Sequence, residues 1–348
     1  MRMFLYGAHR WFIDGILKFL GYLDNTQKGE KSNFVGIRRD VIRGRRHEVQ
    51  AENPFPFGCL IGTEESSVVY IYRRIPLEKI SPRFDLLKEI NLNPETVKLL
   101  TTCRNTENLC SDNVLFLDIE TTGLTVGPSD VAVIIGLGFF RDGYFHIEQL
   151  FLRNYEDEYA SLVALSERLK NFSYLVGYNL KSFDYNFLKK RFLYKRMRIP
   201  SHLDFIDLYI SVRRFFGKRF DSWRLKYVEE VLLKRKREDD LPSELIPEYW
   251  LKFVRTRDVR YAYPILSHNV RDIMGMLYLF LWFFLRMKRP YGCRFSNFQD
   301  KISVLNLLLK YKMNEAIEES FGYILKKESD GNCKKFLLEN YANVVREE

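Results

Sequence analysis

Three apolar segments that follow one another between residues 113 and 152 constrain the fold of this chain more than any other feature. They read NVLFLDI, VAVIIGLGFF and YFHIEQLFL, and the turn pair Asp142 and Gly143 separates the second from the third. Apolar runs of this length are typical of buried strands. Because only short connections join them, the sequence predicts an antiparallel meander.

Helices and strands alternate after the meander. Helical patterns at 156–170 and 183–196 enclose a short strand, SYLVGY, and a second strand-like piece, HLDFIDL, follows. Further helical patterns span 223–233, 244–254 and 262–285. This order predicts an α/β fold, in which a mixed sheet of antiparallel and then parallel strands is flanked by helices.

The sequence divides the chain into three parts. We expect an N-terminal region of unknown role at 1–110, the α/β domain at 111–287 and a helical tail at 288–348. The first part contains a helical start, a basic stretch at 36–46, the strand-like VVYIYRRI and a helical segment near 84–100, and no chemical motif. In the last part, residues 304–345 predict a helical pair that is broken at Asp330 and Gly331.

Composition excludes several classes of protein. With 46% hydrophobic and 29% charged residues in a chain of 348, a globular protein is expected rather than a disordered one. The five cysteines are odd in number and form no CxxC pair, so neither a zinc ribbon nor a disulfide framework is predicted. A reducing cytoplasm fits this cysteine usage best.

The apolar segments are too short to predict a membrane span. The longest run, residues 274–285, has 12 residues, whereas a helix needs about 20 to cross a bilayer. Arg10 and Asp14 interrupt the apolar N-terminal stretch, and no small-residue cleavage site follows it. We therefore expect a buried core helix at 274–285, an amphipathic helix at the N-terminus and no membrane partner.

Basic charge is concentrated in one segment. The chain carries 55 Lys and Arg against 45 Asp and Glu, and residues 189–237 alone hold 16 basic and 5 acidic residues. Such a segment can be a set of solvated helix faces. Aromatic residues such as Phe192 and Trp223 are interleaved with the charges, which favours phosphate contact with some stacking. A nucleic acid is the expected partner, and protein partners stay unknown.

Two carboxylates end the first strand of the meander. Asp118 and Glu120 in LDIETTGL stand two residues apart, so their side chains point to one face and can converge on one cation. A pair of exposed strand-end acids is the simpler alternative. The turn at Thr121, Thr122 and Gly123 favours the cation site.

Two further motifs add acids and a histidine. In GYNLKSFDYNFL, Asp184 follows a short strand and opens a helix, where an acid is often only a cap. In LSHNVRDIMGM, His268 and Asp272 are four residues apart and share one helix face. A histidine on an apolar helix is often a satisfied core residue, but this one lies one turn from an acid.

The acids of the three motifs have the composition of a two-metal phosphodiesterase site. Carboxylate oxygens suit Mg²⁺ or Mn²⁺, and two such ions can clamp the attacking and leaving oxygens of a phosphoryl transfer. The imidazole of His268, with an ordinary pKa of about 6.5, can take the proton of the attacking water. Tyr261 and Tyr263 are the nearest alternatives for that proton.

The order LDIETTGL, YNLKSFD and HNVRDI resembles the DEDD (DnaQ-like) exonucleases of the ribonuclease H-like superfamily. VIIGLG, EQLFLRNYEDE, HLDFIDLYISVRRFF and KREDDLPSELIPEYWLKFVRT narrow the resemblance to the YprB-like family. It covers residues 113–285 and implies a ribonuclease H-like fold, 3′–5′ exonuclease activity and two divalent ions, Mg²⁺ or Mn²⁺. It implies that Asp118, Glu120, Asp184 and Asp272 bind the ions and that His268 lies beside the attacking water. The tail resembles one tetratricopeptide-like hairpin.

Nucleic-acid contacts are expected beside these motifs and in the basic segment. The residues expected to make them are Thr121, Thr122, Asn179, Lys181, Phe183, Arg213 and Arg214. The expected substrate is a single-stranded or frayed strand, and DNA and RNA both stay open, as do exonuclease and endonuclease cleavage apart from the resemblance. A catalytically inactive nucleic-acid-binding module and an adaptor are the alternatives, but buried acids without metal would only destabilise such a fold.

Overall fold

The computed structural model describes residues 54–55, 57–63, 66–80, 94–101, 109–123 and 127–346. The chain divides into two compact units, Met1–Arg46 and His47–Glu348, and every described residue belongs to the second unit. The amphipathic helix expected at the N-terminus and the basic stretch 36–46 lie outside the described residues. The same is true of most of the segment near 84–100, of which α4 (Pro94–Leu100) is described.

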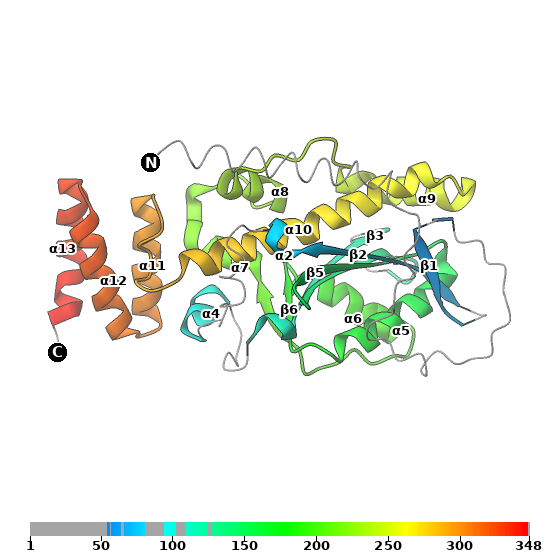
Figure 1. Ribbon diagram of the computed structural model, residues 1–348, viewed down its shortest axis with the longest axis horizontal. Coiled ribbons are helices and arrows are strands. Elements are labelled where there is room, and N and C mark those ends of the chain that lie inside the picture. The colour runs from blue at the N-terminus through cyan, green and yellow to red at the C-terminus, as the bar shows by residue number, and fades with distance from the viewer. Residues whose placement is uncertain are drawn as a thin grey trace. The chain divides into compact units, whose positions relative to one another are not determined.

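A seven-stranded mixed sheet organises the second unit, in the order β1-β2-β5-β4-β3-β6-β7 (Figure 1). The strands are β1 Gly58–Gly62, β2 Ser67–Pro76, β3 Val114–Thr121, β4 Ala132–Arg141, β5 Tyr144–Phe151, β6 Tyr174–Gly177 and β7 Asp204–Asp207. β3, β4 and β5 form an antiparallel meander, and β6 and β7 continue the sheet parallel to β3. The mixed sheet predicted from the sequence is therefore confirmed.

The sheet begins further toward the N-terminus than the boundary expected at residue 111. β2 pairs antiparallel with β5, from Val69 opposite Phe151 to Pro76 opposite Tyr144, and β1 pairs with β2. Without β2, the buried strand β5 would present a row of unpaired backbone groups at an edge. The strand-like VVYIYRRI is thus part of the sheet, and its partner lies too far along the chain for a local pattern to reveal.

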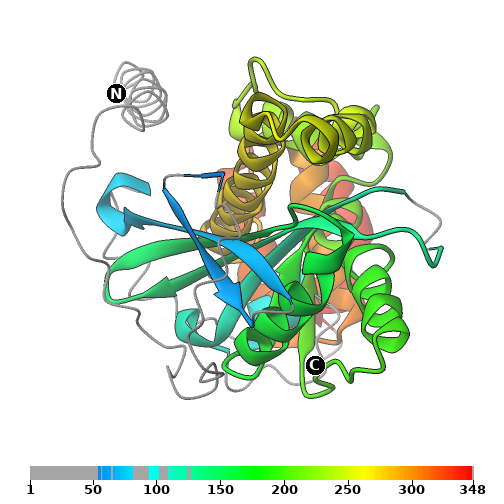
Figure 2. The same cartoon turned by 90° about the vertical axis from the view of Figure 1, so that its right-hand side faces the viewer.

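Helices cover both faces of the sheet. The α-helices of the described residues, including the tail helices α11 to α13 that lie away from the sheet, are α2 Leu77–Ile80, α4 Pro94–Leu100, α5 Glu158–Leu169, α6 Asp184–Tyr194, α7 Leu208–Phe216, α8 Leu225–Val228, α9 Ile246–Thr256, α10 Ala262–Arg286, α11 Phe298–Lys310, α12 Asn314–Lys327 and α13 Gly331–Arg346. α10 runs along one face and packs on β3 and β4, while α5 and α6 lie on the opposite face (Figure 1 and Figure 2). The pattern at 223–233 forms the short helix α8 and then a π-helical turn, Glu229–Leu233.

The alternation of side chains along β3 separates two apolar cores. Phe116 belongs to the core that contains α10 from Val270 onward, and Leu117 belongs to the core that contains α5, α6 and the first turns of α10. Side chains two residues apart on a strand share a face. Asp118 and Glu120 therefore follow Phe116 onto the face that α10 covers.

Two glycines of β4 allow α10 to approach the sheet closely. A Cβ atom added to Gly136 would collide with the side chain of Asn269, and one added to Gly138 would lie 2.8 Å from a methyl carbon of Ile273. Both Asn269 and Ile273 belong to α10. The VIIGLG motif therefore sets the distance between the helix and the strands.

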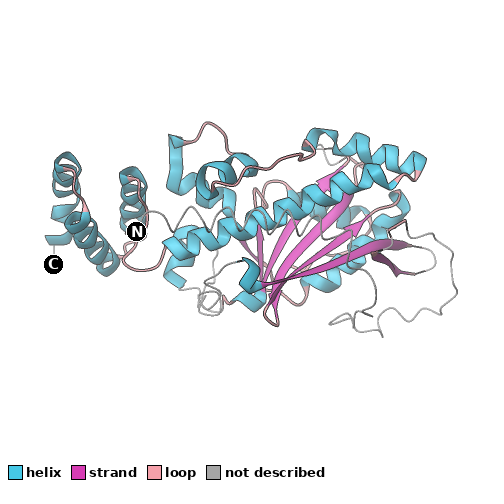
Figure 3. Ribbon diagram, turned by 45° about the horizontal axis from the view of Figure 1, so that its top comes forward, coloured by secondary structure: helices cyan, strands magenta, loops and turns pink. Residues whose placement is uncertain are grey.

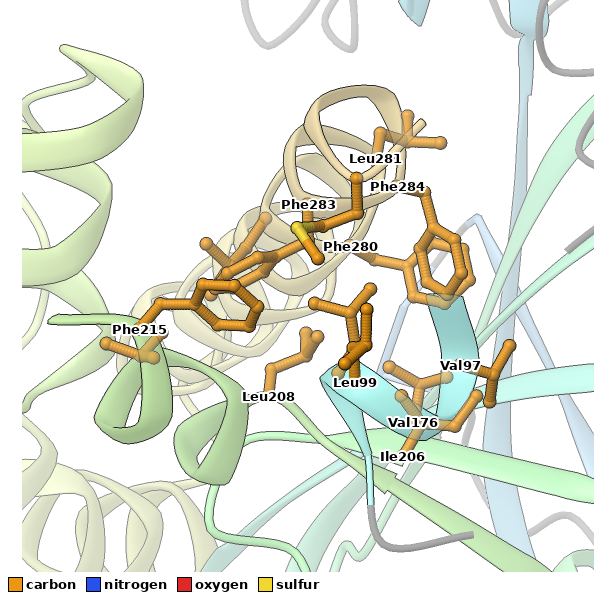
Figure 4. Close-up of a cluster of buried hydrophobic side chains, with 14 of the residues drawn as sticks. Val97, Leu99, Val176, Ile206, Leu208, Phe215, Phe280, Leu281, Phe283 and Phe284 are labelled. Atoms are coloured by element: carbon orange, nitrogen blue, oxygen red, sulfur yellow. The ribbon is translucent and has the colours of Figure 1, made fainter. Parts of the chain in front are cut away.

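The C-terminal half of α10 is the buried helix that the apolar run 274–285 predicts. Phe280, Phe283 and Phe284 join one core with Phe215 of α7 and Leu99 of α4 (Figure 4). Figure 3 shows α10 running across the strands. Among the described residues, no helix is long and apolar enough to span a membrane.

The tail contains three helices, α11 to α13, so the predicted helical pair is wrong by one helix. The side chain of Asn297 caps the first by accepting a hydrogen bond from the Gln299 N–H at 2.8 Å. The first break contains Lys312, whose φ is 54°, and the second lies at Asp330 as predicted. Since the first break has neither glycine nor proline, the sequence pattern runs through it.

Candidate active site

Asp118 and Glu120 lie near the end of β3, beneath α10. Asp118 pairs in register with Gly136 of β4, and the register shifts between Glu120 and Thr121. Such an irregularity re-aims the side chains at the end of a strand. The strand therefore delivers two carboxylates to one point at its end.

Asp184 brings a third carboxylate to the same strand. It is the first residue of α6 and is buried. Its Oδ1 accepts a hydrogen bond from the backbone N–H of Ile119 at 3.2 Å. Since Ile119 stands between Asp118 and Glu120, the start of α6 is tied to the two strand acids.

His268 and Asp272 lie one turn apart on α10 and meet Glu120. His268 Nε2 is 3.3 Å from Glu120 Oε1 and 3.5 Å from Asp272 Oδ2. Each of the three residues offers one possible metal-ligating atom, and these atoms lie within 4.8 Å of one another. The i, i+4 spacing of His268 and Asp272 on the helix therefore brings both side chains to Glu120 of β3, as the sequence predicts.

Burial and the charge of Asp272 together raise the pKa of the other three carboxylates. Burial raises the pKa of Glu120 to about 8, with His268 opposing the rise and Asp272 and Asp184 adding to it. Burial likewise raises the pKa of Asp184 to about 7. The pKa of Asp118 is raised by burial and then by the charges of Asp272, Glu120 and Asp184. The acids thus share one electrostatic environment.

This set of donors fits divalent cations. Ionised carboxylates in a buried site are costly unless a positive charge lies between them. A cation at that point would remove the repulsion that raises the pKa of Asp118. Oxygen ligands of this kind suit Mg²⁺ and Mn²⁺, and the residues that can supply them are Asp118, Glu120, Asp184 and Asp272.

Two buried amides orient Asp118, and the sequence reading did not identify them. Asn269 Nδ2 donates to Asp118 Oδ2 at 2.7 Å, and Gln149 Nε2 donates to Asn269 Oδ1 at 2.8 Å. Gln149 also donates to the carbonyl of Leu266 on α10. A glutamine within the apolar strand YFHIEQLFL was the available signal, because a buried amide needs partners.

Arg237 was counted as one of the cations of the basic segment, but it is buried within the site. Its Nη1 donates to Asp272 Oδ1 and, at 3.2 Å, to Asp240 Oδ2, and its Nη2 donates to Glu229 Oε1. Glu229 belongs to the π-helical turn and is fully buried. Asp272 therefore has a positive partner supplied by the protein.

Other cations of the segment 189–237 also pair with acids of the protein. Arg191 is buried and donates to both oxygens of Glu158, and Lys195 lies 3.0 Å from the same carboxylate. Arg219 pairs with Asp300 of α11. The net charge of the segment therefore overstates its capacity for phosphate, because only the exposed cations face solvent.

The second ring nitrogen of His268 has a carboxylate partner. His268 Nδ1 is 2.9 Å from Asp240 Oδ1, and Ser243 Oγ is 3.3 Å from Nε2. Burial lowers the pKa of His268, but the Asp240 hydrogen bond and the charges of Asp272 and Glu120 raise it above its ordinary value. Asp240 and Ser243 were not predicted, since the run EDDLPSE is typical of an exposed loop.

The threonines expected to contact nucleic acid hold the turn that follows β3. Thr121 Oγ1 donates to the carbonyl of Gly123 at 2.8 Å, and Thr122 Oγ1 accepts from the Val131 N–H at 2.9 Å. Thr121 is buried and Thr122 is half-buried. Both side chains thus shape the loop beside the strand acids.

Asn179, Lys181 and Phe183 lie in the connection between β6 and α6. The backbone N–H groups of Asn179 and Lys181 donate to the carboxylate of Asp207 at 2.9 and 3.2 Å. The Lys181 ammonium lies 5.3 Å from the ring centre of Phe205, and Phe183 is half-buried directly before α6. This connection therefore leads from the sheet to Asp184.

Arg213 and Arg214 of α7 have different surroundings. Arg213 is exposed, and its guanidinium lies 5.7 Å from the Tyr209 ring centre and 5.2 Å from that of Trp223. Arg214 donates to the backbone carbonyls of Leu99 and Thr101 at the end of α4. Arg213 is thus open to solvent, while Arg214 anchors a neighbouring helix.

Comparison with known proteins agrees with this architecture. Residues 115–284 match the model of the RNase_H superfamily. Uncharacterized protein YprB of Bacillus subtilis (strain 168) is 27% identical over 172 residues, which are 49% of this chain and 41% of YprB. The chain thus covers less than half the length of that relative.

A solved structure, the family B DNA polymerase from the hyperthermophilic archaeon Pyrobaculum calidifontis, resembles the chain more distantly. The two are 17% identical, with a TM-score of 0.38, over 67% of this chain and 29% of the polymerase.

The range that matches the family model begins in β3 and ends in α10, so it contains the three elements that carry the acids and His268. The order of antiparallel and then parallel strands in the sheet is the order that the apolar patterns of the sequence predicted. This fold is one of nucleases and related hydrolases. Over the part of the chain that carries the candidate site, the chain therefore resembles the RNase H superfamily and, among its relatives, YprB.

Proposed function

We propose that the protein is a metal-dependent 3′–5′ exonuclease that hydrolyses the terminal phosphodiester bond of single-stranded or frayed nucleic acid. The observation that carries this proposal is that Asp118, Glu120, Asp184 and Asp272 come from three elements and lie so close together that the charge of Asp272 raises the pKa of the other three. Such crowding is costly to a fold and is typical of sites that a cation completes.

Two Mg²⁺ or Mn²⁺ ions are the proposed cofactors, held by the four carboxylates. When bound, such ions neutralise the acids and act as Lewis acids toward a phosphodiester. Asn269 keeps Asp118 oriented through its hydrogen bond at 2.7 Å. The backbone N–H of Ile119 does the same for Asp184.

His268 is the proposed proton acceptor. Its Nε2 faces Glu120 and Asp272, so it can take a proton from a water that adds to the phosphorus. The bond from phosphorus to the 3′ oxygen of the preceding nucleotide then breaks. The products are a nucleoside 5′-monophosphate and a strand shortened by one residue with a free 3′ hydroxyl.

The strand polarity and the cellular setting rest on the family resemblance and on composition. Arg213 beside Trp223 is an exposed cation with an aromatic neighbour, which suits a phosphate followed by a base. A reducing cytoplasm is the proposed setting, because the five cysteines of the sequence form no CxxC pair.

The test is to incubate the protein with 5′-labelled linear DNA and RNA strands and with circular single strands, with Mn²⁺, Mg²⁺ or EDTA. We expect a ladder that shortens one nucleotide at a time from the 3′ end, only with metal, and intact circles. Asp118→Asn is the matched control for a contaminating nuclease. Cleaved circles would instead indicate an endonuclease.

A catalytically inactive nucleic-acid-binding module is the second candidate. The observation that favours it is Arg237, which already donates to one oxygen of Asp272. An inactive module would bind the labelled strands without shortening them in any metal. Binding that is unchanged by Mn²⁺, together with intact strands, would select this candidate.

A further inference from the structure

A short segment between the π-helical turn and α9 lies against α10 and supplies three side chains to the site. Arg237 contacts Asp272, Asp240 contacts His268, and Ser243 lies 3.3 Å from His268 Nε2. The Asp240 side chain is only 3% exposed. A buried carboxylate in this position needs donors for both of its oxygens.

Asp240 has these donors from three side chains. Its Oδ1 is 2.9 Å from His268 Nδ1 and accepts from Arg271 Nη1 at 3.2 Å, while its Oδ2 accepts from Arg237 Nη1 at 3.2 Å. Burial raises the pKa of Asp240, but the hydrogen bond from His268 and the charges of His268 and Arg237 lower it well below its ordinary value. Asp240 is therefore ionised and can only accept hydrogen bonds.

An acceptor at this position determines where the imidazole of His268 carries its proton. Because Asp240 cannot donate, His268 Nδ1 must hold a hydrogen. Nε2 is then the nitrogen that faces Glu120 at 3.3 Å and Asp272 at 3.5 Å. Without Asp240, the ring would be free to turn or to move its hydrogen to Nε2.

We propose that Asp240 is a positioning residue, which keeps His268 Nδ1 protonated and directs Nε2 at the carboxylates of Glu120 and Asp272. The effect of Asp240 on catalysis rests on the proposed nuclease function. The effect of Asp240 on the proton position of the His268 imidazole does not. The simpler alternative is that Asp240 only joins Arg237 and Arg271 and holds the segment against α10. In the first role, substitution of Asp240 changes turnover only through His268. In the second role, it changes stability without His268.

The first experiment follows the histidine directly in the full chain, with ¹⁵N-labelled histidine and nuclear magnetic resonance. Among the five histidines, the signals of His268 are those missing in His268→Gln. We expect a low-field proton on Nδ1 in the wild type, and its loss or a shift of the hydrogen to Nε2 in Asp240→Asn. Asp239→Asn is the matched control, because Asp239 is exposed and adjacent. A wild-type ring with its hydrogen on Nε2 alone would overturn the proposal, whether or not the variant folds.

The second experiment measures turnover and substrate affinity in a double-mutant cycle. Residues that orient a reacting or ligating histidine typically contribute about 10- to 100-fold, so we expect Asp240→Asn to lower kcat by that factor with KM nearly unchanged. In a His268→Ala background the same change should have no further effect. A full additional loss in that background would assign Asp240 to structure alone. If the wild type shows no nuclease activity, the proposed function fails, and the resonance experiment still decides the role of Asp240.

Discussion

Buried carboxylates on the two faces of the sheet differ in their partners. Between α5 and α6, Glu158 accepts two hydrogen bonds from Arg191, Nε to Oε1 at 2.5 Å and Nη2 to Oε2 at 2.9 Å. Beneath α10, Asp118 instead has a neutral amide donor, Asn269, and lies among three other acids that raise its pKa. One buried acid is paired with a cation, and the other is crowded by anions.

This difference separates a structural carboxylate from a functional one. A buried bidentate ion pair satisfies both partners and holds two helices together. Crowded acids weaken the fold that contains them unless something positive joins them, and strongly shifted pKa values gather at functional sites for this reason. The contrast between Glu158 and Asp118 can therefore be tested by substitution of each acid by its amide.

The largest effect is expected from Asp118→Asn, which should abolish cleavage. Loss of one cation ligand removes several kcal/mol of charge stabilisation, so turnover should fall by about 10⁴-fold or more. Stability without metal should hold or rise, because one of four repelling charges is gone. Turnover and the melting temperature are measured on the same preparation. Equal losses in both would make Asp118 a structural acid like Glu158.

The next effect in size is expected from His268→Ala. Removal of a general base lowers turnover by about 10²- to 10⁴-fold, and the concentration of Mn²⁺ that gives half of the maximal rate should not change. A higher metal requirement would instead make His268 a ligand, as its place beside Glu120 and Asp272 allows. His202→Ala is the control, because that imidazole bonds the Phe172 carbonyl at 2.9 Å.

Full activity in His268→Ala would mean that another group accepts the proton of the attacking water. Tyr261 and Tyr263 were the alternatives read from the sequence. Tyr263 packs against the rings of Phe55 and Phe57, and Tyr261 packs edge-on against Tyr249. These contacts hold both tyrosines in aromatic clusters, so bulk water becomes the simpler acceptor in that case.

On the opposite face, Glu158→Gln should destabilise the protein and leave turnover per folded molecule unchanged. The substitution leaves the buried guanidinium of Arg191 without its counter-charge, and breaking such a pair costs about 3–5 kcal/mol. Denaturant unfolding measures this loss. Glu167→Gln is the matched control: Glu167 pairs with Lys170 at the surface, where such a pair contributes about 1 kcal/mol or less. Similar small changes in both variants would remove the contrast on which the comparison rests.

The sequence predicted the crowded acids beneath α10 better than the ion pair of Glu158 and Arg191. Asp118 and Glu120 are two residues apart on a strand, and His268 and Asp272 are one turn apart on a helix, so local geometry gives their direction. The meander and the buried half of α10 followed from apolar patterns of the same local kind.

The remaining features depend on contacts between distant parts of the chain. Arg191 and Arg237 looked like solvated cations because their partners, Glu158 and Glu229, cannot be paired with them from spacing alone. Asp240 stood in an acidic run without periodicity. The pairing of β2 with β5 joins residues that are 68 to 82 positions apart, and no local signal reports it.

The smallest effect, measured per pH unit, is expected in the stability of the metal-free protein. Unfolded Glu120 loses its proton near its ordinary pKa of 4.5, whereas the folded state holds it until about 8. Between these values the folded state binds more protons, so each pH unit upward should favour unfolding by up to about 1.4 kcal/mol for this group. The stability that the proton contributes is complete below pH 4.5 and lost as the pH passes about 8.

Asp184, whose pKa is raised to about 7, acts in the same direction over a lower range. Saturating Mg²⁺ or Mn²⁺ should flatten the profile, since a cation favours the ionised acids and binds only the folded site. Calorimetric melting between pH 5 and 8.5, with EDTA or with metal, measures both slopes. Asp118→Asn should reduce the metal-free slope, because Asp118, whose own pKa is raised, no longer binds a proton in the folded state, and Glu158→Gln should leave the slope unchanged. Equal slopes with and without metal would mean that no cation joins the four acids.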